Sequence, residues 1–352
     1  MKIICSKSSL LKSVSIALKA VPSKTTMPIL ECILMDATTN QIKFTTNDME
    51  LGIETIVDGT IEEKGKVALD AKIFYEIIRR LPDNDVTIKT DDKYAATITC
   101  EKAKFNIPGK SGEDFAYLPM IEKDEPLTIS QYTLKEMIRQ TIFSIAVNEN
   151  NKLMTGELFE IKNNCLKVVS LDGHRISIRK MSLKKDYSDR KVVVPGKTLS
   201  EVSKILSGEV DDQVSIYFTK NHILFEFDQT MVVSRLIEGE YFRIDQMLSS
   251  DYETKLKINK KEFLDCIDRA TLLVREVDKK PIIINITDDD MELRIDSAMG
   301  SMNEEIDIEK EGKDIMIGFN PKFLIDALRV IDDEENYTYL ILPVNINQNQ
   351  AR

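Results

Sequence analysis

The chain has 352 residues, of which 42% are hydrophobic and 30% are charged. This length suggests two or three domains with sizeable cores, and the composition is typical of a soluble globular protein. No stretch approaches the ~20 consecutive apolar residues of a membrane helix, and the first residues lack the apolar run of a signal peptide. We therefore expect a cytoplasmic protein that does not bind membranes.

The formal net charge is −11, which by itself argues against a protein that binds nucleic acid. Net charge governs solubility and long-range attraction, whereas binding to phosphates depends on where the positive groups are placed. An acidic protein with one basic strip could still bind DNA along that strip.

The cysteines are scattered, odd in number and without a CxxC pair. This usage predicts reduced thiols that serve as packing residues, and argues against a disulfide framework or a zinc site. They are Cys5, Cys32, Cys100, Cys165 and Cys266. We expect neither a metal nor another cofactor.

The first predicted helix covers residues 8–21 and places Leu10, Val14 and Ala17 on one face. Alternating segments rich in β-branched residues predict strands at 32–37, 41–46 and 66–71. A second amphipathic helix is predicted at 69–82, and three further strands at 86–90, 96–101 and 104–108.

The same order of elements returns twice along the chain. The next repeat has helices at 132–147 and 194–206, and the third has helices at 260–274 and 319–331, with similar strands between them. The first helices of these repeats place apolar faces at i, i+4 and i+7, and the second helices of all three place them at i, i+3 and i+7. The predicted buried stripes are Leu134, Ile138 and Thr141; Phe263, Ile267 and Ala270; Phe74, Ile77 and Leu81; Leu199, Val202 and Leu206; and Leu324, Ala327 and Ile331. Lys72, Lys197 and Lys322 occupy the same place in the three second helices and are 125 residues apart. We predict the α+β class, with three repeated domains of two helices packed on one side of antiparallel sheets, each with about eight strands. The predicted domains are 1–121, 127–245 and 246–352.

The third repeat is short near residues 331–337, where the first two repeats spend more than twenty residues on a hairpin. Either the hairpin is missing, which would leave an open sheet edge, or a segment of the protein is absent from this sequence. We favour the second explanation.

Each second helix also carries a basic residue seven positions after its lysine, which places the two on one helix face. The pairs are Lys72 with Arg79, Lys197 with Lys204, and Lys322 with Arg329. Most such residues belong to solvated helix faces. Their recurrence in three otherwise diverged helices favours one shared positive surface.

The chain resembles the bacterial replicative sliding clamps, the β subunits of DNA polymerase III. The matching segments follow one another over all three repeats: LLKSV, AVPSKTTMPIL, TTNDMELGIE, LDGHRISI, RLIEGEYF, FNPKFLIDAL and YLILPVNI. The chain departs from the family where Phe242 replaces the usual proline after the aromatic residue, and where the third hairpin is absent.

The resemblance implies a processivity factor and not an enzyme. Two copies would close head to tail into a ring, with helices lining the hole, around double-stranded DNA of any sequence. A domain of this length is roughly 35 Å across, so six leave a hole of about 35 Å, wider than the ~20 Å duplex. Besides DNA and a second copy, the implied partners are the replicative polymerase, the clamp loader and other proteins with a clamp-binding motif.

The resemblance and the repeated basic pairs together assign phosphate contacts to basic residues that do not read bases. These are Lys12, Lys24, Lys72, Arg79, Lys197, Lys204, Lys322 and Arg329.

In the family, the dimer interface joins the last strand of the first domain to a helix and an acidic segment of the third. On this chain the two sides are Lys102, Lys104, Phe105 and Ile107, and Leu272, Leu273, Glu304 and Glu305. Their charges are complementary, and the apolar residues would form the dry centre. The alternative is that Phe105 and Ile107 face their own core.

The family also binds short peptides with apolar anchors in a groove between the second and third domains. The corresponding residues are Met154, Leu171, Gly173, His174, Arg175, Ile176, Phe242, Met247, Asn320, Phe323, Leu340, Leu342, Pro343 and Val344. Core packing is the alternative for each apolar residue in this set.

Two other classes of function remain open. Asp172 and His174 could be an acid/base pair of an enzyme, but no nucleophile, glycine-rich phosphate loop or metal-ligand spacing accompanies them. The repeats could also build a scaffold that does not bind DNA.

Overall fold

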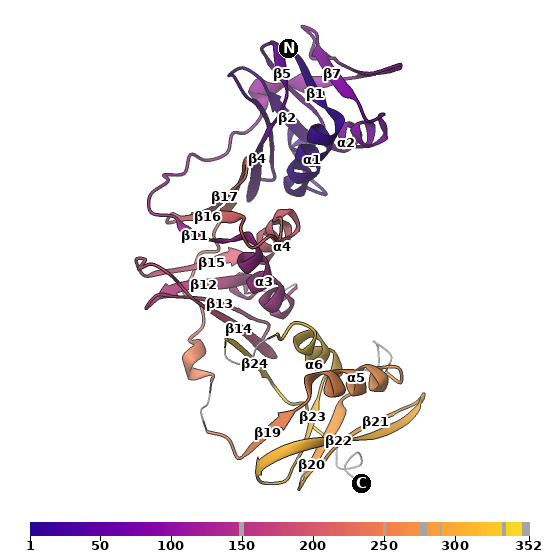
Figure 1. Ribbon diagram of the computed structural model, residues 1–352, viewed down its shortest axis with the longest axis vertical. Helices are drawn as coiled ribbons and strands as arrows, with labels where there is room; N and C mark the ends of the chain where they lie inside the picture. Colours follow the sequence, from indigo (N-terminus) through magenta and orange to yellow (C-terminus); the bar gives the residue numbers. More distant parts are fainter. Residues whose placement is uncertain (148–150, 249–250, 275–279, 289, 333–335, 347–352) are drawn as a thin grey trace. The chain divides into compact units, whose positions relative to one another are not determined.

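The computed structural model describes residues 1–147, 151–248, 251–274, 280–288, 290–332 and 336–346. The chain divides into two compact units, one of residues 1–135 and 197–237, the other of residues 136–196 and 238–352. Within the described residues there are six α-helices and twenty-four strands (Figure 1).

The first unit holds helices α1 (Lys7–Ala17), α2 (Ala71–Arg80) and α4 (Gly196–Ile205). Its strands are β1 (Lys2–Ser6), β2 (Cys32–Asp36), β3 (Ile42–Asn47), β4 (Leu51–Val57), β5 (Thr60–Glu63), β6 (Lys66–Asp70), β7 (Asp85–Thr90), β8 (Ala96–Cys100), β9 (Ala103–Ile107), β10 (Gly109–Ser111), β11 (Leu127–Ser130), β16 (Gln213–Phe218), β17 (His222–Phe227) and β18 (Thr230–Arg235). One sheet has the order β5-β1-β7-β8-β9 and the other β10-β6-β2-β3-β4-β18-β17-β16-β11.

The second unit holds helices α5 (Lys260–Thr271) and α6 (Pro321–Leu328), and the division between the units falls inside α3 (Gln131–Thr141). Its strands are β12 (Gly156–Lys162), β13 (Cys165–Leu171), β14 (Arg175–Ser182), β15 (Arg190–Pro195), β19 (Thr254–Ile258), β20 (Ile282–Thr287), β21 (Asp290–Ser297), β22 (Gly300–Gly312), β23 (Ile315–Phe319) and β24 (Tyr337–Ile341). They form sheets of order β15-β12-β13-β14-β24 and β19-β22-β21-β20-β23.

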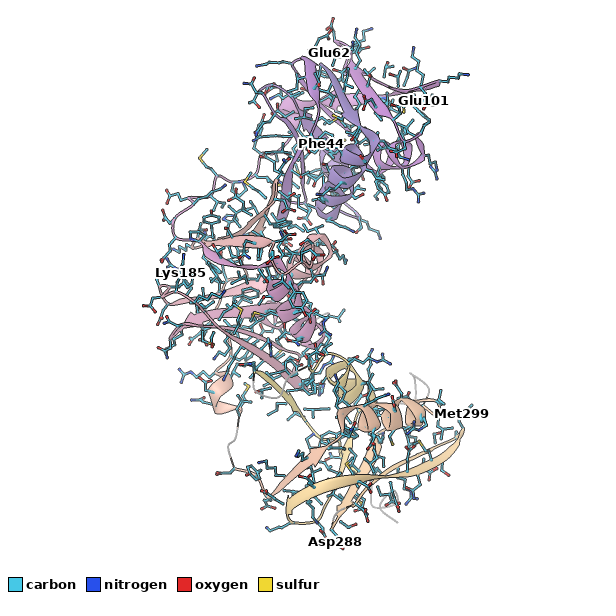
Figure 2. The ribbon with its side chains drawn as sticks, in the orientation of Figure 1. Phe44, Glu62, Glu101, Lys185, Asp288 and Met299 are labelled. Carbon is cyan, nitrogen blue, oxygen red and sulfur yellow. The ribbon has the colours of Figure 1, made fainter. Side chains whose placement is uncertain are left out.

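The core of the first unit lies where α1 and α2 pack against strands. Leu10, Val14 and Ala17 of α1 are fully buried, as their spacing predicts. Phe74 of α2 meets Phe44 of β3 edge to face, with ring centroids 6.1 Å apart. Figure 2 labels Phe44 in the first unit. The predicted helix stripes therefore bury aliphatic and aromatic side chains that stabilise the unit.

In the second unit, α5 packs over β21 and β22 and against α6. Ile267 and Ala270 are buried as predicted, but Leu324 and Ile331 of the last predicted stripe are only half-buried. Ala327 of the same stripe is buried as predicted. Ile331 lies beyond the end of α6 at Leu328, and Ile325 takes a buried place in the helix.

Each observed helix lies where a helix is predicted, although α3 ends at Thr141 and not at 147. In the first unit, β1, β4, β5 and β10 have no counterpart among the predicted strand ranges. The prediction of about eight strands per domain is accurate only on average, since β1–β10, β11–β18 and β19–β24 fall in the three predicted domains. The nine-stranded sheet also crosses the first predicted domain boundary, because β4 pairs with β18. The residue limits of the three domains remain a prediction.

The predicted short hairpin region, 331–337, includes residues 333–335, which lie outside the described residues, as does the predicted domain end at 352.

Within the described part of the chain, no helix is both long and apolar enough to cross a membrane. The same part contains no group of three or more His, Cys, Asp or Glu side chains arranged to hold a metal ion.

Candidate interface sites

The eight basic residues predicted to contact phosphates all have exposed side chains. Four of them already pair with carboxylates of the same unit: Arg79–Glu76 (2.9 Å), Lys197–Asp48, Lys204–Glu201 (2.7 Å) and Arg329–Asp268 (3.1 Å). Exposed ion pairs are worth little, so phosphates can compete for Arg79, Lys204 and Arg329. Lys197 differs, because the side chain of its partner Asp48 is only 5% exposed. Lys12, Lys24, Lys72 and Lys322 have no ion pair among the described residues.

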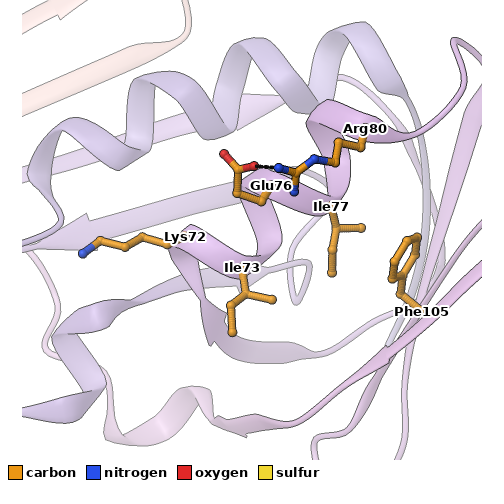
Figure 3. A pocket seen from close by; sticks show the side chains of 6 residues that line it. All are labelled: Lys72, Ile73, Glu76, Ile77, Arg80 and Phe105. Atoms are coloured by element: carbon orange, nitrogen blue, oxygen red, sulfur yellow. Dashed lines mark ion pairs between the residues drawn. The ribbon is translucent and has the colours of Figure 1, made fainter.

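A depression of about 350 Å³ lies between α2 and β9 in the first unit. Ile73, Ile77 and Phe105 supply its apolar floor, and Lys72, Glu76 and Arg80 supply its charged rim (Figure 3). Arg80 and Glu76 form an ion pair at 2.9 Å on this rim.

Two separate predictions meet at this depression. Lys72 was assigned to DNA and Phe105 to the dimer interface, yet both line the same hollow. Sequence reasoning missed Ile73, which is 52% exposed. An isoleucine outside the buried i, i+3, i+7 stripe was the signal that could have indicated a contact surface here.

The alternative that Phe105 faces its own core is wrong, because 39% of the residue is exposed. For Ile107 the alternative holds in part, since this residue is half-buried against the core of the first unit. Lys102 and Lys104 are exposed on either side of Ala103. This end of the unit therefore combines exposed apolar and positive groups.

The second half of the predicted interface lies in the second unit, just after α5. Leu272 is 80% exposed, whereas Leu273 packs partly against the core of its unit. Arg269 donates two hydrogen bonds to Glu304, one of them 2.9 Å long from Nε to Oε2. Glu305, the next residue of β22, is exposed, and its side chain lies on the opposite face of the strand from that of Glu304.

Both halves also offer strand edges. In the sheet order β9 has β8 as its single neighbour. Strand β22 pairs with β21 through residues 300–307, and with β19 through residues 308–312 alone. One side of residues 300–307 is therefore free of strand partners within the described chain, as is one side of β9.

Arg175 is the centre of the predicted peptide groove in the second unit. All three of its guanidinium nitrogens donate hydrogen bonds, to Asp172 (3.0 Å), Asp326 (2.8 Å) and the carbonyl of Phe143 (2.6 Å). Its charge lies 4.3 Å from the ring centroid of Phe323 and 5.3 Å from that of Phe143. A buried cation that binds two carboxylates and lies near two aromatic rings is strongly held.

Burial by itself would lower the pKa of the Arg175 guanidinium, but hydrogen bonds to Asp326, Tyr339 and Asp172 outweigh burial and raise this pKa. Burial raises the pKa of Tyr339 to about 12, because the charged form of tyrosine is the anion. The neutral Tyr339 hydroxyl donates to the carbonyl of Phe323 at 2.9 Å.

A tight turn precedes β14 and presents His174. Gly173 has a φ of 84°, a conformation that glycine adopts without strain. Asp172 accepts hydrogen bonds from the backbone N–H groups of His174 (3.0 Å) and Arg175 (3.1 Å). The His174 ring then stacks on Phe323, with centroids 6.2 Å apart and planes 29° apart.

Asn320 is engaged in a structural role as the N-cap of α6, where its side chain accepts a bond from the Lys322 N–H at 3.0 Å. The backbone of β24 and the following residues borders the groove. Leu342 donates its N–H to the carbonyl of His174 at 2.8 Å, and Val344 donates to that of Gly318 at 2.9 Å.

The remaining predicted groove residues divide by burial. Leu171 and Ile176 are buried, so core packing is the correct alternative for these two. The half-buried or exposed ones are Met154, Phe242, Met247, Phe323, Leu340, Leu342, Pro343 and Val344. Phe242 contacts Tyr241 edge to face at 5.5 Å, which places the unusual aromatic residue beside a buried ring.

The geometry argues against Asp172 and His174 as an acid/base pair. Both carboxylate oxygens of Asp172 are engaged by the turn and by Arg175, and the imidazole stacks on an aromatic ring.

The cysteines are free, and burial raises the pKa of both Cys5 and Cys266 to about 12, which leaves these thiols unreactive near neutral pH.

Comparison with known proteins gives matches along nearly the whole chain. Models of the N-terminal, central and C-terminal domains of the DNA polymerase III beta subunit match residues 1–119, 128–242 and 245–344. The beta sliding clamp of Staphylococcus aureus is 35% identical over 328 residues, 90% of this chain and 87% of that protein.

Two solved structures resemble this chain over nearly its whole length. A candidate DNA polymerase III beta subunit from Eubacterium rectale is 68% identical with a TM-score of 0.97, over 99% of this chain and 100% of that one. The DNA polymerase sliding clamp of Bacillus subtilis is 32% identical with a TM-score of 0.95, over the same shares of the two chains.

Proposed function

The chain belongs to the DNA polymerase III beta subunit family, the sliding clamps, and from this premise we propose that two copies form a ring that encircles duplex DNA. The ring is a processivity factor: it tethers a polymerase to its template without performing chemistry. The observation that carries this proposal is the succession of three clamp-domain matches over residues 1–344. We place its action in the cytoplasm.

The head-to-tail contact joins the depression beside Phe105 of one copy to the segment around Leu272 of the other. The exposed Leu272 side chain supplies apolar surface of the kind that the depression can desolvate. Glu304 and Glu305 bring negative charge to Lys102 and Lys104. Strands β9 and β22 each have a side without a strand partner in the described chain, so their backbones can pair and continue a sheet across the contact.

The DNA is held by exposed basic side chains that contact phosphates. We propose Lys12, Lys24, Lys322 and the partly neutralised Arg79, Lys197, Lys204 and Arg329 for this role. Contacts of this kind are independent of sequence and weaken with salt, which permits sliding. Lys72 borders the apolar depression, and we assign it to the contact between copies as well.

Partner proteins dock in the groove around His174 and Phe323 of the second unit. A sliding clamp of Pseudomonas aeruginosa, 21% identical with a TM-score of 0.92, is solved with griselimycin bound. Aromatic faces and exposed aliphatic residues such as Met247 and Leu342 suit apolar side chains of a short peptide. We propose that the polymerase, the clamp loader and other clamp-binding proteins share this groove.

Light scattering at micromolar concentration and retention on plasmid DNA test the ring. We expect a particle of twice the mass of one chain that, once loaded, stays on circular plasmid and slips off linearised plasmid. Equal loss from circular and linear DNA would show that binding is not topological and would overturn the proposal.

A further inference from the structure

Asp326 joins α6 to β14 through the Arg175 guanidinium. Its Oδ2 accepts a hydrogen bond from Nη1 of Arg175 at 2.8 Å, although the two residues are 151 positions apart. The Arg175 side chain is 8% exposed and that of Asp326 is 25% exposed. A charged pair in such a site is held in one geometry, because neither group has much water as an alternative partner.

The pair fixes the orientation of the aromatic groove wall. Asp326 and Phe323 lie one turn apart on α6, so the bond from Asp326 anchors the same helix that carries the ring. The guanidinium in turn lies 4.3 Å from the centroid of Phe323. His174 stacks on this ring, so a chain of contacts runs from Asp326 through Arg175 and Phe323 to His174.

The donors of Arg175 are directed into the protein and away from a ligand. Its three nitrogens bind Asp172, Asp326 and the Phe143 carbonyl. The rings of Phe143 and Phe323 lie 5.3 Å and 4.3 Å from its charge. A ligand beside Phe323 and His174 therefore meets aromatic side chains next to a neutralised cation. Such a wall favours apolar and aromatic side chains.

We propose that Asp326 is a positioning residue of the peptide groove, which acts through Arg175 to hold Phe323 and His174 in the arrangement that binds an apolar peptide. This inference rests on the proposed partner-docking function. It assigns Asp326 a role in affinity without any contact between Asp326 and the ligand.

The test measures griselimycin binding to the full chain by isothermal titration calorimetry. We expect Asp326→Asn to weaken binding about tenfold, and Asp326→Glu to restore most of the loss because it returns the charge. Asp332→Asn is the matched control, since Asp332 also pairs with an arginine of the second unit, Arg139, but not in the groove. This control should bind as the unchanged chain does.

A double-mutant cycle shows whether Asp326 acts through Arg175. In an Arg175→Met background, Asp326→Asn should add no further loss, because the guanidinium that it positions is gone. The double variant also removes both charges together, which folded proteins tolerate better than one unpaired buried charge. Griselimycin binding by the double variant can therefore be measured even when Asp326→Asn alone fails to fold.

Unchanged griselimycin binding by Asp326→Asn would overturn the inference. An equal loss in the Arg175→Met background would also overturn it, because Asp326 would then act by another route. Failure of the unchanged chain to bind griselimycin would be a different result, since it would count against the partner-docking proposal on which this inference rests and leave the ring proposal standing.

Discussion

Arg269 and Glu304 are joined by two hydrogen bonds within one chain, one of them 2.9 Å long. The bond from Arg269 is the main reason that the pKa of Glu304 lies below its ordinary value. Glu304 therefore has a positive partner before a second copy arrives. Glu305 is exposed and has no ion pair among the described residues, so it is the carboxylate left free for Lys102 and Lys104 of another copy.

We expect Glu305→Lys to raise the dimer dissociation constant about tenfold, because like charges would then face each other at the contact. Sedimentation equilibrium measures this change. Glu309→Lys is the control, since Glu309 lies on the part of β22 that pairs with β19 and is near Lys257 at 3.6 Å. Equal dimerisation of the two variants would exclude Glu305 from the interface.

Leu272→Ala should open the ring without unfolding the chain. The residue is 80% exposed, so its truncation costs little folding stability. Burial of a leucine is worth ~1.5–3 kcal/mol, so we expect a dimer dissociation constant ~10–100-fold higher, measured by light scattering on dilution. Met120→Ala is the control, because Met120 is 99% exposed and lies outside the proposed contact. An unchanged dimer in Leu272→Ala would contradict the proposed interface.

Two charge reversals, Lys322→Glu and Lys197→Glu, should both shorten retention on circular DNA. Only Lys197→Glu should also lower the stability of the fold. Lys322 has no ion pair among the described residues, so its reversal leaves no partner behind. Lys197 pairs with Asp48, whose side chain is 5% exposed, so reversal places two negative charges together. Thermal unfolding and plasmid retention, measured on both variants, separate the two effects. Normal retention for both would count against their contact with phosphates.

Ionisation of the buried Glu157 carboxyl group should lower the free energy of unfolding as pH rises. The residue is fully buried, and neither carboxyl oxygen has a hydrogen-bond partner among the described residues. Burial raises its pKa well above the ordinary value, and Thr141 acts in the opposite direction. The Thr141 hydroxyl donates its hydrogen bond to the Met137 carbonyl at 2.7 Å.

Because the folded-state pKa is the higher one, the contribution of Glu157 to stability is complete below the pKa of the unfolded chain. It is lost as pH rises through the folded-state pKa. The glutamine in the Glu157→Gln variant cannot ionise. The melting temperature of this variant, relative to that of the unchanged chain, should therefore rise as pH increases. Parallel melting curves at all pH values would show that the carboxyl group is not buried in this way.

His174→Ala should weaken griselimycin binding about tenfold and leave the dimer mass unchanged. The imidazole is exposed and stacks on Phe323, 6.2 Å between centroids, so its removal takes away one groove wall but no part of the proposed dimer contact. Calorimetry and light scattering give the two readouts. A variant that binds normally but no longer dimerises would reverse the assignment of these surfaces.

The sequence predicts those parts of the fold that periodicity encodes. Leu10 and Val14 of α1, and Phe74 and Ile77 of α2, are buried at the helical spacing that predicted them. The recurrence of Lys72 at intervals of 125 residues predicts the repeats before any contact is known. The family follows from the motifs spread along the repeats.

The sequence does not predict contacts between distant segments, because no local pattern specifies which strand or side chain will be the neighbour. The pairing of Thr55 with Thr230, and of Arg175 with Asp326, depends on tertiary packing. The same limit explains why Lys72 was assigned to DNA alone, although it borders the hollow that contains Phe105.

The pairing of β4 with β18 makes one continuous sheet from strands on both sides of the segment 119–126. The peptide chain between Pro119 and Pro126 is therefore not what holds these two parts together. A protease cut in this exposed segment would break the covalent link but leave the backbone ladder and its buried side chains in place. The two fragments should travel as one particle in a native gel and separate only under denaturing conditions, so the chain can be nicked there without being released from DNA.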